Sequence, residues 1–234
     1  MNDKIEVKVE KIEQYWIPQI INNCEFPFLV VDNWFTPNEL TAVWKELDFY
    51  LSTPKEKLLR AASTVAAKDP ETKKSLSEAY RFYPDAIYAA RDLSPILKCT
   101  YKQRTREFHQ YFEQMLPWGN SFLTCNKDSA MVSYYEDNDY YKHHHDTFMW
   151  TCLIWLYKEP KQFDGGDLHL ADPDTEIKLK NNRMVMFPSC YSHAVSPIKF
   201  KSKLKELGWG RFCITHFYYA IPGKFDENWN FSNE

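Results

Sequence analysis

From residue 120 onward the chain is divided into short runs of β-prone residues separated by turn residues. The runs contain mainly valine, isoleucine, threonine and aromatic side chains, and the breaks contain glycine or polar residues. Strands of this length and spacing are typical of an antiparallel sandwich or barrel. We therefore predict a β core over residues 120–222. The eight runs are "SFLTC", "SAMVSYY", "FMWTCLIWLY", "GGDLHLAD", "EIKLK", "RMVMFP", "HAVSPIKF" and "GRFCITHFYYAI".

The part of the chain before residue 120 has clearer helix signals. A strand over Phe28–Val31 is followed by Thr36 as a candidate N-cap, with Pro37 at the first helical position. Glu39 lies three residues after the cap, which is the spacing of a capping box. A second helix is predicted over residues 103–116, where apolar side chains recur with helical period.

Residues 53–100 are too interrupted for a firm assignment. Two surface helices are the favoured interpretation, and a flap over a substrate is the alternative. We expect a single domain over residues 1–234, in which residues 1–119 form a helical and strand-containing support region with this candidate flap.

Charge and composition exclude several classes of partner. The 29 basic and 32 acidic residues give a net charge of −3, so no global basic field attracts nucleic acid or anionic lipid. No stretch reaches the roughly 18 apolar residues of a membrane-spanning helix, and the N-terminus lacks the order of a signal peptide. The six cysteines include no C-x-x-C pair, which argues against a structural zinc site. We expect a cytoplasmic protein that binds neither nucleic acid nor membrane.

Three consecutive histidines and an aspartate precede the most apolar run, in "YYKHHHDTFMWTCLIWLY". They are either a solvated polar loop or part of a metal site. Iron(II) in oxygenases is held by two histidines and one carboxylate on one face. A strand end supplies two such ligands as H-x-D, because residues i and i+2 point to the same side, and His144 has this relation to Asp146. His193 on a later strand is the candidate third ligand.

A metal site gains weight from Arg211, which begins the last β-prone run. A buried arginine that faces a metal site is suited to bind a carboxylate through two parallel hydrogen bonds. The histidine tract alone would be assigned to an exposed loop. His143 and His145 keep that assignment or a supporting role. The remaining histidines, His109, His169 and His216, are assigned to packing or surface positions.

The ordered set of motifs resembles the 2-oxoglutarate- and Fe(II)-dependent oxygenases, and more narrowly their prolyl 4-hydroxylase-like branch. The matching motifs, over about residues 130–220, are "MVSYY", "HHD", "TCLIWLY", "FDGGDLHL", "RMVMFPS", "HAVSP" and "RFCIT". The resemblance implies an α+β fold with a double-stranded β-helix, a cupin-like jelly roll, and N-terminal helices packed on it.

The resemblance also implies roles for individual residues. His144, Asp146 and His193 fall on the iron ligands, and Arg211 falls on the basic residue that pairs with the distal carboxylate of 2-oxoglutarate. The remaining positions fall around the cosubstrate: Tyr135 and Thr215 as polar neighbours, and Leu153, Leu168 and Val195 as apolar walls.

Two departures from the family pattern concern the cosubstrate. Trp155 stands where the nearest relatives have a tyrosine whose hydroxyl helps to hold 2-oxoglutarate, although Leu153 and Trp155 are still expected to face it. The interval between His193 and Arg211 contains an insertion, "KFKSKLKELGWG". A lysine in residues 199–205, such as Lys203, is therefore an alternative carboxylate partner. Arg211 is preferred because its R-F-C-I-T context matches.

The resemblance implies a hydroxylase that uses Fe(II), 2-oxoglutarate and O2, with ascorbate as a candidate additional cofactor. Asp146 occupies the coordination position that related halogenases leave open for halide, so hydroxylation is expected. The substrate implied is a prolyl residue in a peptide or protein.

Two alternatives remain. The same chemistry could act on a free amino acid or another small molecule. A nucleobase substrate is disfavoured, because the strand after Arg211 lacks the second arginine of the demethylase branch. The chain could also be a non-catalytic, cupin-like metal-binding protein. A zinc hydrolase would not need Arg211, and the sequence has no H-E-x-x-H.

Overall fold

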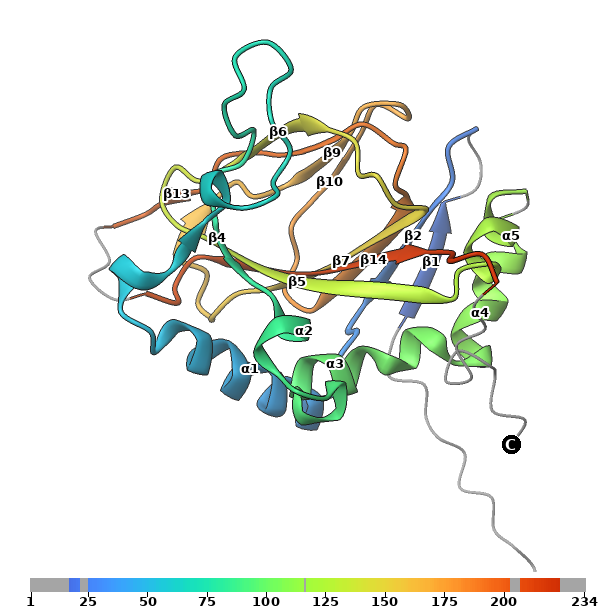
Figure 1. Cartoon of the computed structure of the whole chain (residues 1–234), viewed down its shortest axis with the longest axis horizontal. Coiled ribbons are helices and arrows are strands. Elements are labelled where there is room, and N and C mark those ends of the chain that lie inside the picture. The colour runs from blue at the N-terminus through green and yellow to red at the C-terminus, as the bar shows by residue number, and fades with distance from the viewer. Residues whose placement is uncertain (1–16, 22–24, 116, 203–206, 224–234) are drawn as a thin grey trace, which may run out of the picture.

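The computed structural model describes residues 17–21, 25–115, 117–202 and 207–223. Helices, a large sheet and a small sheet are stacked in three layers, with the helices below the large sheet and the small sheet above it (Figure 1). The large sheet has eight strands in the order β1-β2-β11-β7-β14-β5-β4-β3. They are β1 (Ile17–Ile21), β2 (Phe28–Asp32), β3 (Leu59–Arg60), β4 (Tyr80–Phe82), β5 (Lys127–Tyr135), β7 (Trp150–Leu156), β11 (Arg183–Pro188) and β14 (Arg211–Tyr219).

The small sheet has four strands in the order β10-β9-β12-β6, and a separate pair joins β13 to β8. All of these strand pairs are antiparallel. Their strands are β6 (Tyr141–His144), β8 (Phe163–Asp164), β9 (Leu168–Leu170), β10 (Thr175–Ile177), β12 (His193–Val195) and β13 (Lys199–Phe200). Strands from both sides of residue 120 share the large sheet, because β2 pairs with β11 and β4 with β5.

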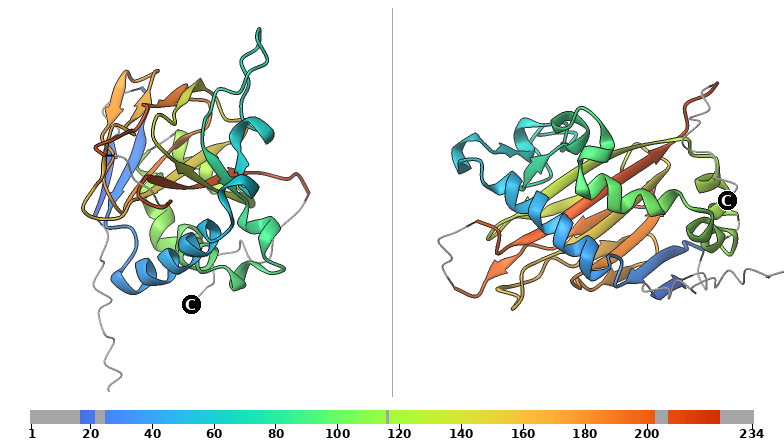
Figure 2. Two further views of the ribbon diagram at one scale, coloured as in Figure 1. Left: turned by 90° about the vertical axis from the view of Figure 1, so that its left-hand side faces the viewer. Right: turned by 90° about the horizontal axis from the view of Figure 1, so that it is seen from below.

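The helices lie across one face of the large sheet, which is clearest in the view from below (Figure 2). The α-helices are α1 (Pro37–Leu51), α2 (Pro84–Ile87), α3 (Pro95–Thr100), α4 (Arg106–Glu113) and α5 (Trp118–Leu123). Short 3-10 turns are η1 (Lys55–Lys57), η2 (Ala61–Ser63), η3 (Arg91–Leu93) and η4 (Tyr101–Arg104).

The predicted capping box at the start of α1 is confirmed. The Thr36 side chain accepts a hydrogen bond from the backbone N–H of Glu39 at 3.3 Å, and the Glu39 carboxylate accepts one from the backbone N–H of Thr36 at 2.8 Å. Two of the four backbone donors that a helix start leaves unpaired are thus satisfied. Val43 and Leu47 on the same helix are buried against the large sheet.

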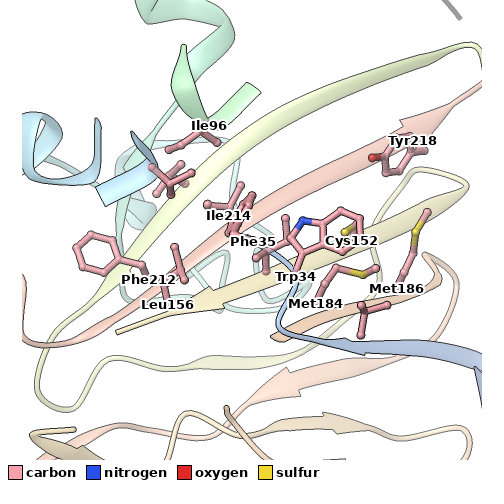
Figure 3. Close-up of a cluster of buried hydrophobic side chains, with 14 of the residues drawn as sticks. Trp34, Phe35, Ile96, Cys152, Leu156, Met184, Met186, Phe212, Ile214 and Tyr218 are labelled. Carbon is pink, nitrogen blue, oxygen red and sulfur yellow. The ribbon is translucent and has the colours of Figure 1, made fainter. Parts of the chain in front are cut away.

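Both faces of the large sheet are buried, and alternation along each strand decides which core a residue joins. On β7, Ile154 and Leu156 point to the helices, whereas Leu153 and Trp155 point to the small sheet. Figure 3 shows the helix-side core, where side chains from β7, β11 and β14 meet Trp34 and other residues of the N-terminal segment. Each fully buried aliphatic side chain contributes about 1.5–3 kcal/mol to folding. The second core lies between the sheets, on the side that also carries the polar site.

One sequence prediction is wrong, and another is met only in part. The "SFLTC" run was expected to be a strand, but it lies mostly in α5, where Phe122 packs against Phe112 with ring centroids 4.1 Å apart. Residues 53–100 do contain two α-helices, α2 and α3, but these are only four and six residues long, and the segment also contributes β3 and β4 to the large sheet. The segment contains four prolines, which interrupt helices: Pro54, Pro70, Pro84 and Pro95.

The loop between η2 and β4 rises beside the small sheet (Figure 1, teal loop at the top). It is joined to that sheet by a bridge between Ser77 and Tyr141 and by a hydrogen bond from the backbone N–H of Glu78 to the carbonyl of Tyr140. Within the described residues, no helix is long and apolar enough to cross a membrane.

Candidate active site

Three residues that could bind a metal ion meet at one end of the small sheet. β12 pairs with β6 so that His193 lies directly opposite His144, and Asp146 follows two residues after His144. One ligand atom from each of the three residues lies within 4.8 Å of the other two. This arrangement follows from the antiparallel pairing, which brings side chains of opposite residues to within about 5 Å.

Backbone carbonyls orient both imidazoles. His144 Nδ1 lies 2.9 Å from the carbonyl oxygen of Lys142, and His193 Nδ1 lies 2.9 Å from that of Tyr191. A carbonyl only accepts, so each Nδ1–H donates, and each neutral ring keeps its lone pair on Nε2. The two Nε2 atoms lie 3.6 and 3.5 Å from the carboxylate oxygens of Asp146. Both rings thus present their metal-binding nitrogen to the same point.

Burial keeps these imidazoles neutral. Desolvation, reinforced by the neighbouring His193, lowers the pKa of His144 to about 3. Desolvation also lowers the pKa of His193, although the nearby Asp146 carboxylate acts in the opposite direction. Because a metal ion binds neutral imidazole, the site needs no deprotonation of histidine at neutral pH.

The Thr151 hydroxyl holds the Asp146 carboxylate, and the Ser189 hydroxyl supports Thr151 in turn. Thr151 donates a hydrogen bond of 2.6 Å to Asp146 Oδ2, and the Thr151 hydroxyl lies 2.8 Å from that of Ser189. The backbone N–H of Asp146 donates to the carbonyl of Ser189 at 3.1 Å. The carboxylate is therefore fixed before any metal binds, as ligating carboxylates commonly are.

Arg211 is fully buried near this cluster, and its charge is not balanced. Its exposed fraction is 0 %, and none of its three guanidinium nitrogens has a hydrogen-bond partner among the described residues. The guanidinium carbon lies 4.9 Å from the ring centre of Tyr135 and 5.5 Å from that of Trp155. An isolated buried cation is strongly unfavourable, so this environment fits an anion that would complete the site.

A small cavity joins the three candidate ligands to Arg211. Of the residues expected around the cosubstrate, Tyr135, Leu153, Val195 and Thr215 line this cavity. Leu168 is buried in the core between the sheets instead. Trp155 is next to Arg211, and its indole Nε1 is buried without a partner in the part of the chain that the structure describes.

The remaining histidines lie elsewhere. His143 and His169 contact each other through ring nitrogens 3.3 Å apart on the exposed side of the small sheet. His109 packs against Phe122, and His216 is paired with Asp128 at 2.9 Å. His145 lines a larger cavity next to the site.

The two insertion lysines that the structure describes form contacts away from the cavity next to Arg211. Lys199 bonds the side chain of Asn138, and Lys201 lies 3.7 Å from the Asp164 carboxylate. Lys203 and Lys205 lie outside the described residues.

Several neighbours of the site were not predicted. Tyr141 stacks on His144 with ring centroids 3.6 Å apart, and Thr151 and Ser189 orient Asp146. Arg81 is a second buried arginine in the cavity wall. In the sequence, Arg81 lies between the aromatic residues Tyr80 and Phe82. This alternation of residue types was the available signal that the segment is a strand.

The sequence matches a known family model in the region that holds His144, Asp146, His193 and Arg211. Residues 130–219 match the model described as the 2OG-Fe(II) oxygenase superfamily. A PKHD-type hydroxylase from a Janthinobacterium strain is 33% identical over 61 residues. That match covers 25% of this chain and 26% of the relative, so the aligned region is about a quarter of the curated relative's length.

Solved structures with low sequence identity share the fold. A Pseudomonas putida prolyl-4-hydroxylase superposes with a TM-score of 0.52 and 17% identity, over 89% of this chain and 94% of the other. A 2OG-Fe(II) oxygenase-family oxidoreductase from Burkholderia pseudomallei gives 0.51 and 13%, over 85% and 88%. The expected α+β fold with a jelly-roll core is confirmed by this likeness.

Proposed function

We propose that the protein is a 2-oxoglutarate-dependent Fe(II) dioxygenase that hydroxylates its substrate, and the match of residues 130–219 to the 2OG-Fe(II) oxygenase superfamily model supports this proposal. The observation that carries this proposal is the unpaired, fully buried Arg211 on the cavity that also contains the histidine–aspartate cluster. A dicarboxylate that binds a metal at one end places its other carboxylate at such a cation.

The donor set fits iron. Two imidazoles and one carboxylate are the ligands found in non-haem Fe(II) oxygenases, and they leave coordination positions open. In the proposal, His144, Asp146 and His193 hold the metal, and Arg211 binds the distal carboxylate of 2-oxoglutarate. Tyr135 and Thr215 line the same cavity and provide hydroxyl groups near that carboxylate.

The protein's own residues position and shield the reactants. Lys142 and Tyr191 fix the two imidazoles through their carbonyls, and Thr151 fixes Asp146. Leu153 and Val195 supply apolar walls that exclude water and strengthen the electrostatic contacts inside. Bound Fe(II) and 2-oxoglutarate supply the oxidising chemistry, in which O2 converts 2-oxoglutarate to succinate and carbon dioxide and hydroxylates a C–H bond.

For the substrate we propose a prolyl residue in a peptide or protein. The motif order resembles the prolyl 4-hydroxylase-like branch, and the matched relative is named a PKHD-type hydroxylase. Ascorbate is proposed as a reductant that keeps the iron in its ferrous state.

The proposal is tested by comparing Asp146→Ala with His143→Ala. His143 belongs to the same histidine tract but contacts His169 outside the proposed triad. We expect Asp146→Ala to lose metal-dependent 2-oxoglutarate binding, measured by calorimetry without oxygen, and to lose substrate-coupled succinate release. His143→Ala should retain both. Full succinate release by Asp146→Ala would refute the assignment of the metal site.

The substrate is tested separately with proline-containing peptides and free amino acids. Iron-dependent succinate release that increases with peptides supports the prolyl proposal. Release that increases only with free amino acids would exclude a peptide substrate and leave the oxygenase proposal intact.

A further inference from the structure

Arg81, at the centre of β4, is a second buried cation without a counterion. Its exposed fraction is 3 %. Its guanidinium donates to the hydroxyl of Ser133, to the hydroxyl of Ser77 at 2.8 Å, and to the sulfur of Met131 at 3.5 Å, all of which are neutral. Its Nε is buried without a partner, and no carboxylate of the described residues lies within 4.0 Å. A buried guanidinium in neutral surroundings favours the binding of an anion.

Arg81 is located between two cavities. It lines the small cavity that contains the metal-binding cluster, and it also lines an outer cavity of about 490 Å³. Its guanidinium carbon lies 5.3 Å from the ring centre of Tyr141, which in turn stacks on His144. Asp146 lines both cavities as well. A ligand in the outer cavity therefore meets Arg81 and the metal-binding cluster together.

The outer cavity has the character of a binding site for a small molecule or a single residue. Its walls are largely apolar and include Phe148 and Phe217, whose rings stack with centroids 4.7 Å apart. Its other acid is Asp85, which accepts a hydrogen bond from the backbone N–H of Ala130 at 2.9 Å and lies 3.4 Å from Arg91. Asp85 is thus already compensated, and Arg81 is the uncompensated charge in the wall.

The charges expected at the loaded site leave Arg81 unpaired. Asp146 carries one negative charge, Arg81 and Arg211 carry two positive charges, and Fe(II) adds two more. The two carboxylates of 2-oxoglutarate are assigned to the metal and to Arg211. One positive charge then remains, at the border of the outer cavity, and a single carboxylate would balance it.

We infer that Arg81 binds a carboxylate of the primary substrate, which makes the protein selective for substrates that present a carboxylate near the carbon to be hydroxylated. This inference rests on the proposed oxygenase function and narrows its substrate class. The carboxylate is either the α-carboxylate of a free or C-terminal residue or the side chain of an acidic residue beside the target.

Matched acids and amides test the inference in the wild-type protein. The protein is loaded with Fe(II) and 2-oxoglutarate without oxygen, and binding is measured by calorimetry. One arm compares N-acetylproline, N-acetylleucine and N-acetylphenylalanine with their amides. The other compares N-acetyl-Pro-Glu-amide with N-acetyl-Pro-Gln-amide. We expect the acid to bind at least about tenfold more tightly in one arm. The arm that shows the preference identifies the source of the carboxylate.

Equal affinity of acid and amide in both arms, or no binding by any acid, would overturn the inference. In that case normal 2-oxoglutarate binding shows that the oxygenase proposal still stands. Failure to bind 2-oxoglutarate in the presence of Fe(II) would instead contradict the oxygenase proposal itself. The two failures are therefore distinguishable.

Substitutions of Arg81 test whether this residue causes the tighter binding of the acid than of the amide. Arg81→Gln should abolish the preference for the acid and keep 2-oxoglutarate affinity within about twofold, and Arg81→Lys should keep part of the preference. Arg106→Gln, which removes an exposed arginine on α4, is the matched control and should behave as wild type. Loss of 2-oxoglutarate affinity in Arg81→Gln would overturn the inference, because Arg81 would then bind the cosubstrate. If Arg81→Gln does not fold, Arg81→Lys and the wild-type comparison decide.

Discussion

At the scale of single residues, Trp155 lies next to Arg211 and can influence what that arginine binds. Its indole Nε1 is buried and has no partner among the residues that the structure describes, and its ring lies 5.5 Å from the Arg211 guanidinium carbon. A buried N–H beside an unpaired cation is suited to donate to the same carboxylate. The indole N–H can thus share with Arg211 the carboxylate that we propose Arg211 binds.

We predict that Trp155→Phe weakens 2-oxoglutarate binding by about tenfold, because it removes a charge-assisted hydrogen bond and keeps an aromatic ring. Calorimetry on the iron-loaded protein without oxygen measures this. Trp44→Phe, a change on α1 in the helix-side layer, is the control and should leave the affinity unchanged. An unchanged affinity in Trp155→Phe would show that Nε1 does not contact the cosubstrate.

Some residues of the candidate site could be predicted from the sequence, and others could not. That His144, Asp146 and His193 lie together was predictable, because strand periodicity and a fixed motif order constrain their positions. Arg81 was not predictable, because its role depends on β4 pairing with β5, 50 residues later in the chain. Thr151 and Ser189 were not predicted for a similar reason. Hydroxyl residues that orient a ligand have no characteristic spacing in the sequence.

At the scale of elements, the turn before β9 supports Arg211. Gly166 has a φ of +80°, and a Cβ built there would lie 2.9 Å from Arg211 Cδ. An L-residue at such a φ is strained by about 1–2 kcal/mol, and the added methyl group would also displace the arginine. The conformation of this turn and the position of the guanidinium are therefore coupled.

We predict that Gly166→Ala lowers both the free energy of unfolding and, by about tenfold, the affinity for 2-oxoglutarate. Gly223→Ala is the matched control, because Gly223 has a φ of +72° but nothing lies within 4 Å of its added Cβ. It should lose stability only. If Gly166→Ala binds 2-oxoglutarate as wild type does, the turn does not position Arg211.

The capping box of α1 gives a prediction that concerns stability alone. Thr36→Ala removes the acceptor for the backbone N–H of Glu39 and should lower the free energy of unfolding by about 1 kcal/mol. Urea unfolding measures the loss, with the exposed Thr41→Ala as the control on the same helix. Because α1 packs on the opposite side of the large sheet from the site, 2-oxoglutarate affinity should not change. A reduced affinity would contradict this separation.

Elements were predictable where local patterns decide them. The strand β11 coincides with the predicted "RMVMFP" run, and α1 begins at the predicted cap. The strand prediction for the "SFLTC" run was wrong because a five-residue apolar segment fits a strand or a helix equally well. The packing of Phe122 on α4 and Trp150 favours the helix. The strands in residues 53–100 were not predicted because β3 and β4 have only two and three residues, and they depend on tertiary pairing, β3 with β4 and β4 with β5.

At the scale of the whole molecule, four buried histidines with lowered pKa values make stability depend on pH: His109, His144, His193 and His216. Desolvation lowers the pKa of His109 to about 4 and the pKa values of His144 and His216 to about 3. In the unfolded chain a histidine binds a proton near pH 6.5. Below this pH the unfolded state therefore binds more protons, so their contribution to stability is complete above pH 6.5 and is lost as the pH falls.

We predict that each buried histidine contributes a loss of about 2 kcal/mol to the free energy of unfolding of the metal-free protein between pH 6.5 and 5. Urea unfolding at several pH values measures the slope. His216→Gln should reduce the loss by about one histidine's share, whereas His169→Gln, at a partly exposed position, should not. A slope in His216→Gln equal to that of wild type would contradict the neutral, buried state of His216.

The alternation along β14 has a consequence for protein engineering. Positions 211, 213, 215 and 217 line the cavity, whereas Phe212 and Ile214 belong to the core under the helices. Of these positions, Phe217 lines both the small and the outer cavity, so a mutagenesis library there would vary the wall that a substrate meets without changing a residue assigned to the metal or to 2-oxoglutarate. Substitutions at Phe212 and Ile214 would instead disturb the core under the helices and lower the stability.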